Sequence, residues 1–415
     1  MRSASVLLFL AALAVSGASP AAVPPGSTTL LLYDTVAKPF SLVNEVEPIA
    51  VLLTRFDTRV EKREAARATL ADIEKADAVI VVGIAGFPEM NAAVLEYLGR
   101  TKKPLMAVGA ASSLTLAQPS MRGVKSTPLE KAGIHYRDRE WKQRLDPFFP
   151  APANGVEVLA KVTSPGKTQP LSWRIGSRFG FSALPGDPPL STIFSDVLLD
   201  FYGVGKSPDS ALLYIVQDYH PGDAPQPFRR LVDYFAHHKA PFVVTAQVRD
   251  IPAGLEITPR EDYMNSLRYA QSRGGRIFLR GENSPEEVRK FLEEGIVITG
   301  AENAPAALEL GNPTCQRTPG EAPVSLFSAV PLRRAEGGWL LPANVRGGLD
   351  GAAITYLEEH IRDIASMRGG LAGVVIPAWM PFQHMRDIVD AARSSHLAAV
   401  DPVTAFPVSQ PVQNP

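Results

Sequence analysis

Short, fully apolar runs that alternate with helical patterns restrict the fold of this chain most strongly. Ala78–Gly83 and Ala211–Val216 contain no charged residue. Strands of this composition are typical of parallel sheets that helices cover on both faces, because neither face of such a strand meets water. Phe228–His238 has amphipathic helical spacing, and Arg63–Lys75 is predicted to be a polar-faced helix. The alternation therefore predicts an α/β protein built from repeated strand–helix units.

The alternation occurs in two parts of the chain, and 415 residues are enough for two domains. We expect a doubly wound domain at residues 28–150 and an incomplete (β/α) barrel at residues 209–405. Residues 151–208 contain Pro- and Gly-rich stretches and are predicted to be an irregular connection. An antiparallel patch is the alternative, in which Lys161–Arg174 could supply edge strands. Residues 304–345 are predicted to be a long irregular insertion in the barrel.

The amino terminus has the pattern of a secretory signal. Arg2 precedes the apolar run Val6–Val15, and small residues follow as far as Ala22. This run is too short to span a bilayer, and no later stretch reaches the roughly 20 apolar residues of a membrane helix. We therefore expect residues 1–22 to be a signal peptide and the protein to be exported to the periplasm or beyond the cell. An uncleaved membrane anchor is the alternative.

Charge and cysteine content exclude several classes of function. Lys and Arg number 42 against 43 Asp and Glu, so nothing favours binding to nucleic acid or to an anionic membrane surface. Cys315 is the single cysteine, so no internal disulfide and no cysteine-based metal site can form within the chain. We expect Cys315 to be buried apolar filler.

The segment Ala211–Pro221 carries the most chemical information. Its apolar strand ends on Gln217, Asp218 and His220. The carboxyl ends of barrel strands are where enzymes of this architecture place their functional residues. Because residues two apart on a strand point to the same face, His220 could be a metal ligand together with Asp218. Without a third partner, a His that packs in a loop is the favoured interpretation.

Several segments resemble a family of secreted bacterial proteins of largely unknown function that are related to polysaccharide deacetylases. In the second half these segments are Ala211–Pro221, Lys239–Thr245, Ser272–Gly281, Glu336–Asn344 and Arg368–Pro377. In the first half, Leu32–Asp34 and Asp77–Gly83 resemble an amidotransferase-like domain. The resemblance implies a flavodoxin-like doubly wound domain followed by an incomplete (β/α) barrel of the polysaccharide deacetylase type.

The resemblance also implies a metal-dependent deacetylase site, with one Asp and two His as ligands, an acidic base and a late His acid. Asp218 keeps the position of the metal-binding Asp, but Gln217 stands at the acidic position. Arg280 and Ser284 stand at the two metal His positions, and Ile376 stands at the late His position. One carboxylate remains of the three ligands that hydrolytic zinc sites typically use.

These replacements carry structural predictions of their own. Ser284 is followed by Pro285 and, three positions on, by Glu287, which is the pattern of a helix start with Ser as the N-cap. Arg280 is expected at a strand end close to Asp218, where the two side chains could form an ion pair. An Arg exposed at the rim is the alternative.

The sequence thus favours a catalytically degenerate, metal-free relative that binds carbohydrate or an envelope protein and carries no cofactor. Gln217, Asp218, Tyr219, Arg280 and Trp379 are the candidate binding residues. Further aromatic candidates for sugar stacking are Trp339 and Phe382.

An active carbohydrate deacetylase or hydrolase is the alternative, with Asp218, His220 and Glu282 as catalytic candidates and Zn as the cofactor. A structural role in an envelope assembly is a third hypothesis. In the first domain, Ser112 and Ser113 follow a strand but lack the Gly-x-Ser-x-Gly elbow of a nucleophile. Gly83–Gly86 could hold an anion, but it lacks the glycine pattern of a phosphate-binding loop.

Overall fold

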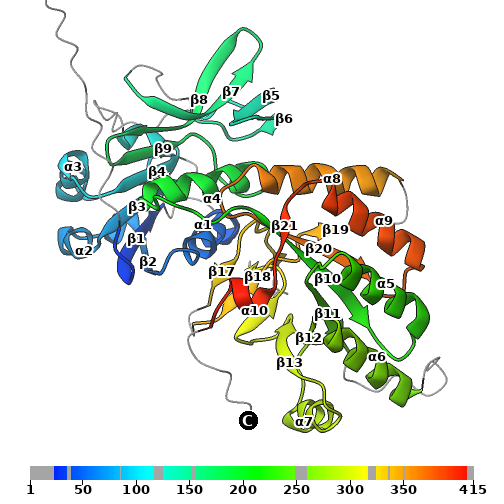
Figure 1. The fold of residues 1–415 in the computed structure, drawn as a ribbon. Helices are drawn as coiled ribbons and strands as arrows, with labels where there is room; N and C mark the ends of the chain where they lie inside the picture. The colour runs from blue at the N-terminus through cyan, green and yellow to red at the C-terminus, as the bar shows by residue number, and fades with distance from the viewer. Residues whose placement is uncertain are drawn as a thin grey trace, which may run out of the picture.

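The computed structural model describes residues 23–34, 39–84, 86–115, 125–150, 155–247, 259–315, 324–334, 337–348 and 351–408. Two large sheets organise these residues (Figure 1). Among them, no helix combines the length and the apolar character needed to cross a bilayer. The expected signal peptide at residues 1–22 lies outside the described residues, as does the burial of Cys315.

The first sheet has nine strands in the order β2-β1-β3-β4-β9-β8-β7-β5-β6. Its elements are β1 (Ser27–Tyr33), α1 (Pro39–Leu53), β2 (Thr58–Glu64), α2 (Leu70–Lys75), β3 (Ala78–Gly83), α3 (Ala92–Arg100), β4 (Leu105–Gly109), β5 (Leu129–Tyr136), β6 (Arg139–Leu145), β7 (Glu157–Ser164), β8 (Lys167–Ile175), β9 (Arg178–Phe181) and α4 (Leu190–Phe201). The five strands from β2 to β9 are parallel, and the remaining four continue the sheet as antiparallel neighbours.

Helices cover both faces of the parallel part, as the apolar strands predicted. Ile80 and Val82 of β3 pack in the layer that contains α1 and α4, whereas Val79 and Val81 pack in the layer that contains α2 and α3. The whole of β3 is buried, which explains why its sequence lacks polar alternation.

Two expectations for this half of the chain were wrong. Residues 63 and 64 belong to β2, and α2 begins at Leu70, because Thr69 and Asp72 form a capping box there. The expected irregular connection instead supplies β7, β8, β9 and α4 to the first sheet and its core. The strands expected within residues 161–174 are present as parts of β7 and β8, but they lie inside the sheet and not at its edge. Strand β9 pairs with β4, more than 60 residues earlier in the chain, and local sequence patterns do not reveal such a pairing.

The second sheet follows the order β17-β18-β14-β13-β12-β11-β10-β20-β19 and is parallel from β18 to β19. Its strands are β10 (Ala211–Tyr219), β11 (Phe242–Ala246), β12 (Gly275–Arg280), β13 (Ile298–Glu302), β14 (Leu308–Leu310), β17 (Leu332–Arg333), β18 (Trp339–Leu341), β19 (Val345–Arg346), β20 (Leu371–Pro377) and β21 (Ala398–Ala399), which pairs with β10. The helices are α5 (Pro225–His237), α6 (Arg260–Ser272), α7 (Pro285–Glu293), α8 (Gly351–Ala365), α9 (Phe382–Arg393) and α10 (Pro402–Ala405). Strands β15 (Thr314–Cys315) and β16 (Val324–Ser325) form a separate pair.

A short chain segment holds the two ends of this sheet together and makes it curl. Strands β18 and β19 lie near opposite ends of the strand order, yet only residues 342–344 separate them in sequence. At about 3.3–3.6 Å per residue, this segment can bridge only a short gap. The Asn344 side chain fixes it, because its Nδ2 donates to Ser328 O at 2.7 Å and Leu371 O at 3.1 Å. Its Oδ1 accepts from Gly373 N at 2.9 Å.

The predicted insertion at residues 304–345 therefore needs correction. It contributes β14 and β18 to the curled sheet, in addition to irregular chain. These strands are only three residues long, which is too short for their sequences to show a period.

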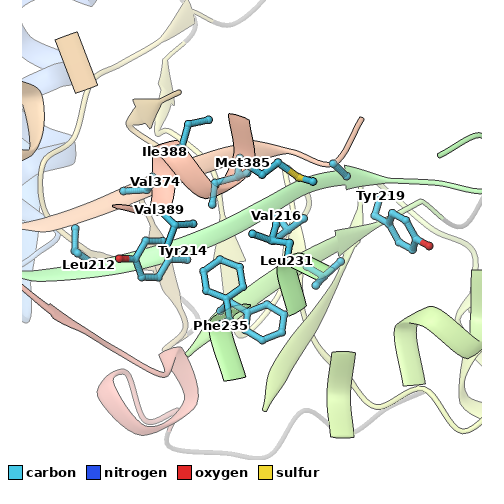
Figure 2. Packing of buried hydrophobic residues seen from close by; sticks show 14 of the residues in the cluster. Leu212, Tyr214, Val216, Tyr219, Leu231, Phe235, Val374, Met385, Ile388 and Val389 are labelled. Carbon is cyan, nitrogen blue, oxygen red and sulfur yellow. The ribbon is translucent and has the colours of Figure 1, made fainter. Parts of the chain in front are cut away.

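Alternate residues of the curled sheet pack in two separate apolar layers. Leu212, Tyr214 and Val216 of β10 face helices α5 and α9, where they meet Leu231 and Phe235 among others (Figure 2). The residues on the inner face of the strands pack with one another. They include Leu213, Ile215, Val243, Phe278, Leu308, Leu341 and Val375. The interior of the curled sheet is consequently a packed core and not a channel.

Several polar contacts join the part of the chain that forms the first sheet to the part that forms the second, and one of them involves a buried carboxylate on α4. The side chain of Asp196 is 0% exposed and accepts hydrogen bonds from N and Nε of Arg368, at 2.8 and 3.1 Å. Arg137 Nη2 lies 2.8 Å from its other oxygen, to which Tyr136 also donates. Burial alone would lower the pKa of Arg368, but hydrogen bonds with Asp200 and the charge of Asp196 outweigh it and raise that pKa.

We predict that Asp196→Ala lowers the free energy of unfolding by about 3 kcal/mol, because it leaves two guanidinium groups at the interface without their shared partner. Urea denaturation followed by circular dichroism measures this loss. Glu96→Ala removes an exposed partner of Arg100 and should cost less than about 0.5 kcal/mol. Equal losses for the two variants would contradict the prediction.

A second prediction concerns the bridge at residues 342–344. A Cβ at Gly373 would lie 1.8 Å from Pro342 O, so Gly373→Ala should destabilise the fold by about 1–3 kcal/mol. Gly205→Ala is the matched control, because a Cβ at Gly205 meets nothing within 4 Å. Thermal unfolding of both variants tests whether the close approach of the bridge matters.

Candidate functional site

Polar side chains gather where the parallel strands of the curled sheet end. Gln217, Thr245 and Arg280 are two residues beyond inward-facing apolar residues of β10, β11 and β12, and Glu302 ends β13. Because residues two apart on a strand share a face, the same alternation that fills the interior carries these side chains to its open end. We call this end the mouth and define it by Gln217, Asp218, Thr245, Arg280 and Glu302.

A bulge near the end of β10 places Asp218 beside Gln217 at the mouth. Asp218 has a φ of 68°, and the pairing of β10 with β11 shifts between Val216 and Tyr219. Asp is among the residues that tolerate this left-handed conformation best. The Asp218 N–H donates to Thr245 Oγ1 at 2.8 Å, which fixes the bulge to the neighbouring strand.

The expected ion pair between Arg280 and Asp218 is confirmed. Arg280 Nη1 contacts Asp218 Oδ1, and the side chains of the two residues are 41% and 33% exposed. The hydrogen bond with Asp218 raises the pKa of Arg280, against the lowering effect of burial. The guanidinium therefore stands against the carboxylate that would bind a cation.

Glu302 also belongs to the site, although no pattern in the sequence had indicated it. The residue is 2% exposed, and Gln217 Nε2 donates to its Oε1. Its Oε2 is buried and has no hydrogen-bond partner within the described part of the chain. Pairing of β12 with β13 places Glu302 opposite Arg280. An acidic residue directly before Asn303-Ala-Pro305, after the short strand Ile298–Glu302, was the available signal.

The two other catalytic candidates from the sequence, His220 and Glu282, have surroundings of their own. His220 follows β10, in a turn where its Nδ1 accepts from Gly222 N at 2.9 Å and its N–H donates to Asp223 at 3.0 Å. His220 lies beyond the end of β10, so the two-residue spacing of a strand does not by itself place it on the same face as Asp218. Glu282 is exposed and lines a separate hollow of about 460 Å³ with Asn283.

The other replaced positions have structural roles. Ser284 is the N-cap of α7 and forms the expected capping box with Glu287. Ile376 is buried between β20 and the helices, so it faces away from the mouth. Among the described residues, no group of three or more His, Cys, Asp or Glu could hold a metal ion. Together with the positive charge of Arg280, these positions do not fit the zinc site of the alternative hypothesis.

The aromatic candidates divide by location. Tyr219 is fully buried and stacks on Phe228 with the ring centroids 3.9 Å apart, so it cannot contact a ligand at the surface. Trp339 begins β18 and therefore lies at the opposite end of the strands from the mouth. Trp379 is 59% exposed and follows Ala378, whose N–H donates to Gln217 O at 2.9 Å. Trp379 is thus placed at the rim of the mouth.

The serines of the first domain are not accessible nucleophiles. Ser112 and Ser113 are 1% and 2% exposed in the turn after β4. Gly83 permits close packing, because a Cβ there would lie 2.6 Å from Ala111 N and 2.7 Å from Gly86 O. A packing role thus accounts for Gly83 without a bound anion.

No family model matches the sequence, and no curated protein matches it. A similar solved structure is described as a 4-hydroxy-2-oxoglutarate aldolase/2-deydro-3-deoxyphosphogluconate aldolase from TTHB1. It shares 15% identity, covers 44% of this chain and 92% of its own, and has a TM-score of 0.23. A similarity at that TM-score carries no argument about this chain.

The cap at Ser284 leads to a prediction. Ser284→Ala should lower the free energy of unfolding by about 1 kcal/mol, because the first turn of α7 loses its side-chain acceptor. Glu282→Ala, two positions earlier and exposed, should stay within about 0.5 kcal/mol of the parent. Chemical denaturation measures the free energy of unfolding of both variants. Equal losses of stability in the two would contradict the capping role.

Proposed function

We propose that this protein binds carbohydrate at the mouth of a deacetylase-type barrel and does not carry out metal-dependent hydrolysis. The observation that most directly supports this proposal is the contact between Arg280 and Asp218. A guanidinium remains charged at every physiological pH. Arg280 therefore keeps a positive charge against Asp218, at the position that a metal cation would need. In this proposal, the fold of the barrel is retained, and a ligand-binding surface stands where a deacetylase would have its catalytic centre.

The chemistry of the mouth suits a ligand rich in hydroxyl groups. The mouth contains planar side-chain groups that donate or accept hydrogen bonds, namely those of Gln217, Arg280 and Glu302. Such groups can form hydrogen bonds with neighbouring hydroxyl groups of a ligand. The buried Glu302 accepts a hydrogen bond from Gln217 Nε2 and so fixes the orientation of the Gln217 amide at the mouth. Trp379 adds an exposed aromatic face at the rim, against which the apolar face of a sugar ring can pack.

Features of the fold support the family resemblance on which this proposal draws. The five parallel strands of the first sheet follow the order β2-β1-β3-β4-β9, which corresponds to the flavodoxin-like order 2-1-3-4-5. The curled second sheet corresponds to the incomplete barrel that the resemblance implies. The proposed setting is the periplasm or the cell exterior, because of the signal-like residues 1–22.

The decisive experiment combines binding, metal content and activity on the purified mature protein. N-acetylglucosamine oligomers and cello-oligosaccharides are titrated by calorimetry, and the same preparation is analysed for zinc and for acetate release. Saturable binding without stoichiometric zinc and without acetate release supports the proposal. Stoichiometric zinc that is lost in Asp218→Ala, together with acetate release, would overturn it in favour of an active deacetylase.

Trp379→Ala should weaken binding of the preferred oligosaccharide about tenfold, because it removes the exposed stacking face. Tyr356→Ala is the matched control, since Tyr356 is also 59% exposed but lies on α8. Calorimetric titration of both variants shows whether the loss of affinity is specific to Trp379 or follows from the removal of any exposed aromatic side chain. Unchanged affinity in Trp379→Ala would exclude Trp379 from the site.

A further inference from the structure

A second cavity lies at the opposite end of the barrel strands, between the two domains. It has a volume of about 300 Å³, and Ala211, Leu371 and Trp339 from the amino ends of β10, β20 and β18 line it. Phe56 and Leu199 contribute from the first domain. This volume is at the lower end of the range for small-molecule sites, which are usually concave and mostly apolar.

One guanidinium lines this apolar cavity without a carboxylate partner. Arg55 Nη2 donates to Arg368 O at 2.8 Å, and longer contacts of 3.5 Å reach Gly369 O and Ser195 O. No ion pair in the described part of the chain includes Arg55. Burial lowers the pKa of Arg55 to about 10, although the charge of Asp196 acts in the opposite direction.

The neighbouring charges do not compensate Arg55. Asp196 is already bound by Arg368 and Arg137, and Asp200 is bound by Arg368. Three guanidinium groups thus face two carboxylates at this interface, so one positive charge is left over. Asp209 also lines the cavity, but it is an exposed residue, where water screens its charge.

A ligand with an anionic head would satisfy the remaining donors of Arg55. The guanidinium has five N–H groups in a planar fork that matches a carboxylate. Gly369 leaves room for this fork, because a Cβ there would lie 2.6 Å from Arg55 Nη2. The apolar walls, which include Trp339 and Phe406, would cover an apolar body of the same molecule.

We propose that the cavity between the domains binds a small carboxylate with an apolar body, with its head on Arg55 and its chain against Phe56, Leu199 and Trp339. The site lies at the end of the strands opposite to the mouth, so its occupation is independent of the carbohydrate proposal. A bound ligand would touch both domains and stabilise their present arrangement by mass action.

Calorimetric titration of the mature protein with octanoate, octanol and octylammonium tests the proposal. We expect octanoate to bind saturably, and octylammonium, which has the same chain but the opposite charge, to bind at least about tenfold more weakly. Equal affinities for the two ions, or no saturable binding of octanoate, would overturn the proposal.

Variants of Arg55 separate the charge from the cavity. Arg55→Met should weaken octanoate about tenfold while octanol binding stays unchanged, and Arg55→Lys should fall between Met and the parent. Retained octanol binding shows that the cavity itself is intact in the variant. Arg289→Met, on the exposed face of α7, is the matched control and should bind octanoate like the parent. Val400→Phe places a ring in the cavity and should weaken octanoate and octanol alike.

Undiminished octanoate binding in Arg55→Met would overturn the role of the guanidinium. Undiminished binding of both molecules in Val400→Phe would place the ligand elsewhere. Neither result bears on oligosaccharide binding at the mouth, so this proposal and the proposed function can fail separately.

Discussion

The buried carboxylate of Asp196 joins the two parts of the chain that form the two large sheets. It is fully buried on α4, and it binds Arg368 from the turn between α8 and β20 and Arg137 from the turn between β5 and β6. A buried charge is costly unless it is paired and hydrogen-bonded, so the segments that supply its partners must come together for the domains to dock. The same convergence leaves Arg55 as the extra cation beside the cavity between the domains.

The curled sheet separates apolar and polar chemistry along the direction of its strands. Alternate residues fill the interior with Leu, Ile, Val and Phe, and the polar residues appear where the strands end. The Pro342–Asn344 bridge imposes the curvature, because it links strands near opposite ends of the sheet. Gln217, Arg280 and Glu302 therefore converge at one mouth, although up to 85 residues separate them in sequence.

Site residues could be predicted from the sequence where their role depends on residues close to them in the chain. The cap at Ser284 followed from four consecutive residues, and the contact of Arg280 with Asp218 followed from two recognisable strand ends. Glu302 was missed because β13 is short and half-polar. The two-residue spacing of Asp218 and His220 did not decide their relative placement, because the pairing with β11 shifts after Val216 and β10 ends at Tyr219.

The sequence by itself determined the α/β class, most strand and helix positions in the two repeated regions, and the cap at Ser284. These properties follow from local periodicity, capping and residue chemistry. The tertiary structure alone decided that residues 157–201 complete the first sheet, that β18 and β19 bring the ends of the second together, and that Glu302 lies buried beside Gln217. Each of these features depends on contacts between segments that are distant in the chain. The free energy of such contacts comes from burial and strand pairing, which local sequence patterns do not reveal.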